Sequence, residues 1–149
     1  MNPEVWNEIA GRWRGTPFSA NACVPGPSGG VSCQALAAAI YVEAGILPPD
    51  VQIPAGRITR GRFSRESEIE PWVRNRPEFA EILTFDGDPE PGDLLGFKIG
   101  NCLNHIGVAL SGGQFVHCLE GPGVVFSSIH DATWASRLAA RWEARREQA

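Results

Sequence analysis

The sequence has little basic charge and few cysteines, and each shortage argues against a class of protein. Its 13 Lys and Arg residues are outnumbered by 17 Asp and Glu residues, which gives a net charge of -4. A nucleic-acid-binding domain is normally basic, so this balance argues against one. The four cysteines are too few for a disulfide scaffold in a chain of 149 residues.

Long hydrophobic runs are also lacking. No stretch approaches the roughly 20 apolar residues of a membrane-spanning helix. The N-terminus has neither the basic start nor the apolar core of a secretory signal, so we expect a protein made in the cytoplasm, without a membrane span. The length is typical of one domain, and we predict a single domain over residues 1–149.

Turn-forming residues divide the chain into a helical first half and a β-rich second half. The apolar spacing predicts a short helix over residues 4–13, followed by a loop rich in Gly, Pro and Ser. A second helix is expected from Cys33 to Ala44, with Ser32 as its N-cap. Residues 66–80 are expected to hold one or two short helices around Trp72 and Phe79.

Alternating apolar residues then predict four strands and a closing helix, which together indicate an α+β fold. The strands are expected over residues 94–99, 105–110, 114–119 and 124–126. The closing helix is expected over residues 133–146, from Trp134, Leu138 and Trp142 at a spacing of four.

Cys33 stands at the start of the second predicted helix, directly after a glycine-rich loop. The helix dipole and unpaired backbone N–H groups stabilise a thiolate at such a position. A free cysteine is more often a small buried core residue, so the position alone leaves both interpretations open. A nucleophilic thiol also needs an imidazole nearby and a third group that orients the imidazole.

Two histidines lie in the predicted hairpin. If residues 111–113 form a three-residue turn, Gly107 pairs with His117. His105 and His117 then lie one diagonal step apart on one face, within reach of each other. A two-residue turn would place them on opposite faces. Two histidines on one face, together with a cysteine at a helix start, indicate a cysteine enzyme.

The other cysteines offer a rival interpretation. Cys102 and His105, followed by His117 and Cys118, resemble the spacing of a zinc ligand set. Adjacent residues of a strand point to opposite faces, so His117 and Cys118 can hardly bind one ion. We therefore predict no metal and no other cofactor, and we interpret Cys23, Cys102 and Cys118 as reduced structural thiols.

Three motifs occur in order along the chain. They are WRGTPF (residues 13–18) with GGVSC (29–33), then PGDLLGF (91–97), then HIGVAL (105–110) with GQFVH (113–117). Together they resemble the NlpC family of bacterial cell-wall cysteine peptidases. The resemblance implies a papain-like α+β core, in which the nucleophile's helix packs on an antiparallel sheet.

The resemblance also implies the chemistry. Cys33 would be the nucleophile, His105 the base and His117 the orienting residue. The expected reaction is hydrolysis of an amide bond in a peptidoglycan stem peptide through a thioacyl-enzyme, and in that family the bond usually follows D-glutamate. A chain without a secretion signal would suit release by lysis or carriage in a phage-like particle, with phage tail proteins as partners.

Three positions depart from the family's pattern. Ser32 replaces an aspartate, Gln34 replaces a small residue, and Phe18 replaces a tyrosine that is implicated in the oxyanion region. The loss of one oxyanion donor costs roughly 10²–10³ in rate. Backbone N–H groups near Ser32 and Cys33 would have to supply the missing oxyanion donor. The Gln34 side chain either donates towards the substrate or lies on the helix surface. The alternative function is a weakly active or inactive structural or binding module of a phage-type tail.

A cluster of arginines at residues 57–65 has two interpretations. It is most simply a solvated loop. It could also meet the carboxylates of an acidic peptide.

Overall fold

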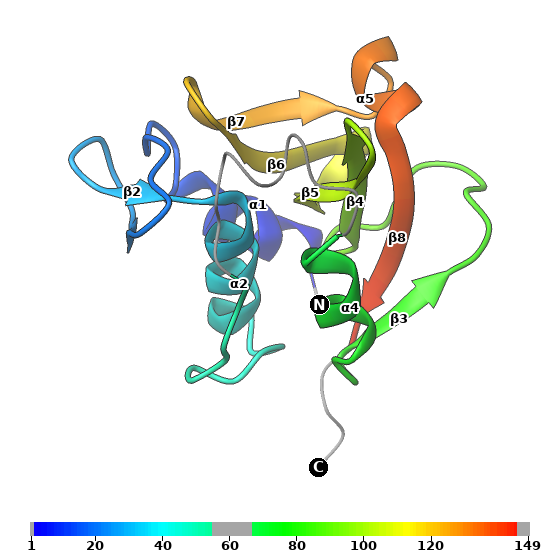
Figure 1. The fold of residues 1–149 in the computed structure, drawn as a ribbon, viewed down its shortest axis with the longest axis horizontal. Coiled ribbons are helices and arrows are strands. Elements are labelled where there is room, and N and C mark those ends of the chain that lie inside the picture. Colours follow the sequence, from blue (N-terminus) through cyan, green and yellow to red (C-terminus); the bar gives the residue numbers. More distant parts are fainter. Residues whose placement is uncertain (1, 55–66, 146–149) are drawn as a thin grey trace.

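The structure is a computed structural model that describes residues 2–54 and 67–145. At its centre is a six-stranded antiparallel sheet with the strand order β3-β8-β4-β5-β6-β7 (Figure 1). The strands are β3 (Phe79–Ile82), β4 (Leu94–Ile99), β5 (Cys102–Ala109), β6 (Gln114–Leu119), β7 (Gly123–Ser128) and β8 (Leu138–Ala144). A separate two-stranded ribbon joins β1 (Cys23–Val24) to β2 (Gly30–Val31).

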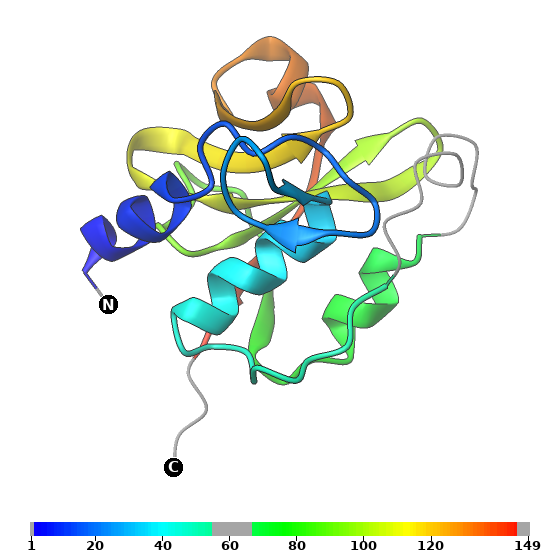
Figure 2. The ribbon, with the colours of Figure 1, turned by 90° about the vertical axis from the view of Figure 1, so that its left-hand side faces the viewer.

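The helices are divided between the two faces of the sheet. Figure 2 shows α2 (Cys33–Glu43) and α4 (Ile69–Arg74) on one side of the sheet, and α1 (Pro3–Gly11) shares their hydrophobic core. The short α5 (Ala132–Arg137) lies on the other side. A helix packed on an antiparallel sheet is the α+β fold that the sequence predicts, and the prediction is confirmed.

Two hydrophobic cores lie against the two faces of the sheet. Alternation along β4 places Leu94 in the larger core, beneath the helices, and Leu95 in the smaller one. The smaller core lies under α5 and consists of Leu95, Phe97, Ala109, Phe115 and Ile129, with Trp134 and Leu138 packed against it.

Local chemistry fixes both ends of α2. The side chain of Ser32 accepts a hydrogen bond from the Ala35 N–H at 3.2 Å, which confirms Ser32 as the N-cap. Gly45 follows the last turn with φ +78°, a conformation that L side chains rarely adopt. Between these ends, Leu36, Ile40 and Tyr41 are buried in the larger core.

The β5–β6 hairpin has the predicted register. Its turn spans η1 (Ser111–Gly113), and Val108 pairs with Val116. The Leu110 N–H donates to the Gln114 carbonyl oxygen at 2.7 Å, which closes the three-residue turn. Continued by one pair, this register sets Gly107 opposite His117, as predicted.

The closing segment differs from its prediction. A single helix over residues 133–146 is wrong, because the chain leaves α5 after Arg137 and enters β8. A spacing of four is even, so it also fits a strand, where alternate residues share a face. From Ala140 onwards apolar and charged residues alternate, and pairing with β3 and β4 decides in favour of the strand.

The middle of the chain is partly as predicted. Trp72 lies in α4, whereas Phe79, expected near a helix, begins β3. The arginine cluster at residues 57–65 lies outside the described residues. Within the described ranges, no helix is long and apolar enough to cross a membrane.

Trp142 tests the assignment of β8 to the sheet. Its side chain is 1% exposed in the larger core, so we expect Trp142→Ala to lower the free energy of unfolding by about 3–5 kcal/mol. Trp142→Phe is the matched control, because it keeps an aromatic ring and removes an indole N–H that has no partner among the described residues. Urea unfolding should show a clearly smaller loss for Trp142→Phe. Equal losses would contradict this packing.

Candidate active site

Cys33 lies in the first turn of α2 and reaches β5. Its Sγ donates to the Oε1 of Gln34 at 3.1 Å, so Gln34 turns onto the thiol rather than lying along the helix surface. The backbone N–H of Ile106, the residue after His105, also points at the thiol.

A gap between β5 and β6 makes this contact available. Pairing between the two strands covers only Val108 with Val116 and Ala109 with Phe115. The Leu110 N–H faces β6, so by alternation the Ile106 N–H also faces β6, beyond the end of this pairing. Cys33 therefore approaches the sheet where these two strands separate.

The protonation state of Cys33 reflects two opposing effects. Burial raises the pKa of the thiol to about 11, while the backbone N–H groups of Ile106, Gln34 and Cys33 itself act to lower it. Burial is the larger effect. At neutral pH Cys33 is therefore a neutral thiol whose sulfur is surrounded by hydrogen-bond donors.

His105 and His117 form a buried pair on the opposite face of the sheet from α2. Their Nε2 and Nδ1 atoms, respectively, are 2.8 Å apart, which confirms the predicted same-face arrangement. Gly107 lies between them, and a Cβ there would come within 2.9 Å of the Phe115 ring and 3.0 Å of the Val116 carbonyl oxygen. The hairpin can pack this closely because Gly107 has no side chain.

An aromatic wall encloses the pair. Trp134 of α5 lies 4.6 Å from the His117 ring and 5.7 Å from the His105 ring, measured between centroids. Phe97 and Phe115 complete the wall. The sequence does not predict Trp134 at this site, because its spacing fits one long helix over residues 133–146 rather than the short α5 that lies over the histidines.

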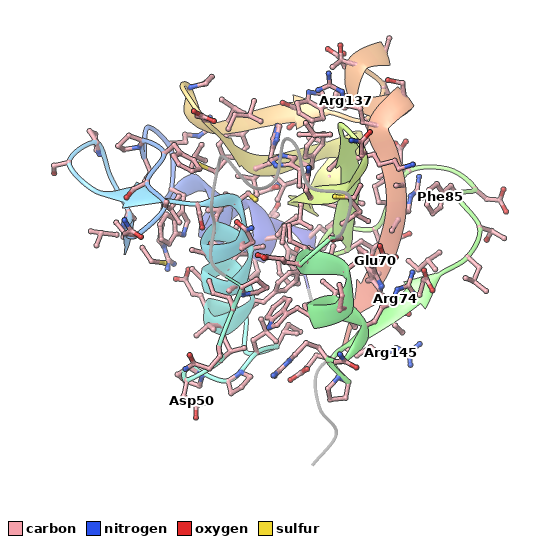
Figure 3. All side chains as sticks on the ribbon, viewed as in Figure 1. Asp50, Glu70, Arg74, Phe85, Arg137 and Arg145 are labelled. Atoms are coloured by element: carbon pink, nitrogen blue, oxygen red, sulfur yellow. The ribbon has the colours of Figure 1, made fainter. Side chains whose placement is uncertain are left out.

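Burial keeps both imidazoles neutral. It lowers the pKa of His105 to about 4, and the positive charge of Arg137 acts in the same direction. Burial also lowers the pKa of His117, and the neighbouring His105 adds to the effect. Figure 3 shows Arg137 on α5, across the sheet from α2.

Ser32 directly precedes Cys33 in the chain, and Phe18 pairs with the residue before Ser32. Phe18 is half-buried and forms a bridge with Val31, two residues before the cysteine. The Ser32 hydroxyl serves as the helix cap. A part for these two residues in substrate binding stays a prediction, as do the catalytic roles of Cys33 and the two histidines.

The residues of the alternative zinc set point in different directions. His117 faces Trp134, whereas the Cys118 thiol donates to the Val31 carbonyl oxygen at 3.2 Å. In the part of the chain that the structure describes, no three His, Cys, Asp or Glu side chains are grouped to hold a metal ion.

Residues 13–143 match the NlpC/P60 family. The chain belongs to this family. Among curated proteins, it is 38% identical over 46 residues to murein DD-endopeptidase MepS/murein LD-carboxypeptidase of Escherichia coli, a stretch covering 31% of this chain and 24% of that protein. It is 38% identical over 58 residues to the probable endopeptidase NlpC of Escherichia coli, covering 38% of this chain and 36% of that protein. The match thus spans about a quarter to a third of these relatives.

Solved structures share the fold at low sequence identity. The NlpC/p60 domain of the peptidoglycan hydrolase SagA has a TM-score of 0.60 and 19% identity, covering 96% of this chain and 99% of that one. RipD of Mycobacterium tuberculosis, described as a non-catalytic NlpC/p60 domain protein, has a TM-score of 0.57 and 16% identity, covering 96% and 95%. These neighbours confirm the papain-like core predicted from the motifs.

The lowered histidine pKa values predict an acid-sensitive fold. Between the ordinary histidine pKa of about 6.5 and the lowered folded values, the unfolded chain binds more protons than the folded one. The two histidines therefore lower the free energy of unfolding as the pH falls from about 7 to 4. Asp93 opposes this trend, since burial raises its pKa to about 6.

A variant isolates the histidine contribution. His117→Gln removes one of the two groups, so its free energy of unfolding should fall less steeply than the parent's between pH 7 and pH 4. His130→Gln, which alters an exposed histidine, is the control. Urea unfolding at four pH values measures all three proteins. Parallel curves for the parent and His117→Gln would contradict the assigned burial effect.

Proposed function

We propose that this chain is a cysteine hydrolase that cleaves an amide bond in the stem peptide of bacterial peptidoglycan. The observation that carries the proposal is the buried His105–His117 hydrogen bond on the strand whose Ile106 N–H, next to His105 in the chain, points at the thiol of Cys33 at the start of α2. Relatives named as murein endopeptidases and a peptidoglycan hydrolase support the substrate class.

The reaction would have two stages, and a proton would pass through His105 in each. The Cys33 sulfur attacks the amide carbonyl carbon while the Nδ1 of His105 takes the thiol proton. The tetrahedral intermediate collapses to a thioester, and the same proton leaves on the amine product. Water then attacks the thioester, gives a proton to His105 and releases the acid, and the proton returns to the sulfur.

The resting protonation states determine how the first stage begins. The pKa of Cys33 is raised and that of His105 is lowered, so the thiol and the imidazole of the proposed pair are both neutral at rest. Proton transfer then accompanies attack rather than preceding it. The Sγ–H first has to turn from Gln34 towards His105, since its hydrogen bond goes to Gln34.

The oxyanion of the tetrahedral intermediate needs hydrogen-bond donors, and the Phe18 side chain has none. The Ser32 cap occupies the Ala35 N–H and leaves the first N–H groups of α2, those of Cys33 and Gln34, close to the sulfur. We assign the oxyanion to these N–H groups and to the Nε2–H₂ of Gln34, which can turn towards the oxyanion once the thiol no longer donates to the Gln34 Oε1. A phage-type tail setting stays a prediction.

A second candidate function is a binding module that holds peptidoglycan without cleaving it. Two observations favour it, namely the missing hydroxyl at Phe18 and the raised pKa of the Cys33 thiol. The solved structure of RipD shares the fold and is described as non-catalytic. Hydrolysis and binding therefore have to be measured separately.

Replacement of the thiol tests the enzyme proposal. Cys33→Ala should abolish hydrolysis of purified muropeptides with the fold intact, because Ala is a good helix former. Cys23→Ala is the matched control, since it removes an exposed thiol beside α2 and should keep the parent's rate. Products are followed by chromatography and mass spectrometry.

Two outcomes would reject the enzyme proposal. Hydrolysis by Cys33→Ala near the parent's rate would show that another group acts as the nucleophile. Sedimentation of the parent protein with intact peptidoglycan, without any released product, would support the binding module instead.

A further inference from the structure

Ser127 extends the histidine pair to a third residue. Its Oγ lies 2.8 Å from the Nε2 of His117, whose Nδ1 is 2.8 Å from His105. Ser127 belongs to β7, where it pairs with Phe115, while His117 pairs with Val125. The serine is therefore the diagonal neighbour of His117, on the opposite side from His105.

The position of the hydrogens on the two linked histidine rings decides whether His105 can act as a base. If His105 takes a proton on Nδ1, its Nε2 already carries hydrogen and donates to the Nδ1 of His117. His117 then carries its own hydrogen on Nε2, which points at the Ser127 oxygen. In the opposite tautomer, His117 donates to His105 and forces the His105 hydrogen onto Nδ1, where it blocks the base.

Ser127 makes the productive arrangement possible because His117 is 0% exposed. The hydroxyl can accept from an Nε2–H or donate to a bare Nε2, so either tautomer is satisfied while the serine is present. A donor at this depth is out of contact with bulk solvent, and an unpaired buried donor is costly. Without the serine oxygen, the tautomer with a bare Nε2 would be favoured, since an unpaired acceptor is tolerated better than an unpaired N–H. The residue opposite His117, Val125, offers no polar side chain in its place.

We propose that Ser127 is a positioning residue that accepts from the Nε2–H of His117, removes the penalty on that tautomer and so allows the Nδ1 of His105 to accept the thiol proton. The proposal rests on the proposed cysteine hydrolase function. It assigns no contact with substrate to Ser127.

Three substitutions at position 127 separate hydrogen bonding from packing. Ser127→Ala and Ser127→Val remove the oxygen, whereas Ser127→Thr keeps it on a side chain with nearly the shape of valine. Ser128→Ala is the control in the same strand, since its Oγ bonds to the His130 N–H instead. Each protein is examined by ¹⁵N NMR of the histidine rings, which reports the tautomer, and by muropeptide hydrolysis.

We expect His117 to populate the Nε2–H tautomer in the parent, Ser127→Thr and Ser128→Ala, and to shift towards Nδ1–H in Ser127→Ala and Ser127→Val. The value of kcat should fall by about tenfold or more in these last two variants, with KM unchanged, because a wrong tautomer removes the base. An unchanged His117 tautomer in both variants, or equal kcat for Ser127→Thr and Ser127→Val, would overturn the proposal. A parent without hydrolytic activity would reject the proposed function alone, because the NMR result still decides the role of Ser127.

Discussion

The hydrogen bond between His105 and His117 is the contact on which the rest of the site depends. It joins two strands of a hairpin whose turn has three residues, and it passes over Gly107, where a side chain would strike Phe115 and Val116. A change of one residue in the turn would place the two rings on opposite faces. The register of β5 and β6 therefore decides whether an orienting group can reach the base.

Burial shapes the chemistry of the site on both faces of the sheet. Beneath α5, Trp134 and the two phenylalanines keep the histidines neutral, and beneath α2 the same effect keeps Cys33 protonated. A neutral thiol and a neutral imidazole need no separated charges in the resting protein. The separation of β5 from β6 leaves the N–H of Ile106, the residue after His105, to point at the Cys33 sulfur.

Local sequence patterns predict the elements that carry the site. The features that these patterns do not predict, the strand β8 and the contact of Ser127, depend on pairing between distant strands. The cap at Ser32, the hairpin register and the same-face histidines depend on spacings of a few residues, so the sequence alone predicts them. The prediction of one helix over the closing segment was wrong because the spacing of Trp134 and Trp142 also fits a helix. Only the pairing with β3 and β4 shows that β8 is a strand. Ser127 carries no local signal, since its contact requires the register of β6 with β7.

The central claim is that His105 activates the Cys33 thiol, and the rate of thiol alkylation tests it most directly. Iodoacetamide labelling at pH 7, read by peptide mass spectrometry, gives the rate at Cys33 relative to the exposed Cys23 in the same molecule. General-base assistance contributes roughly 10²-fold or more, so the Cys33-to-Cys23 ratio should fall by about that factor in His105→Ala. A ratio that is the same in the parent and in His105→Ala would contradict the claim.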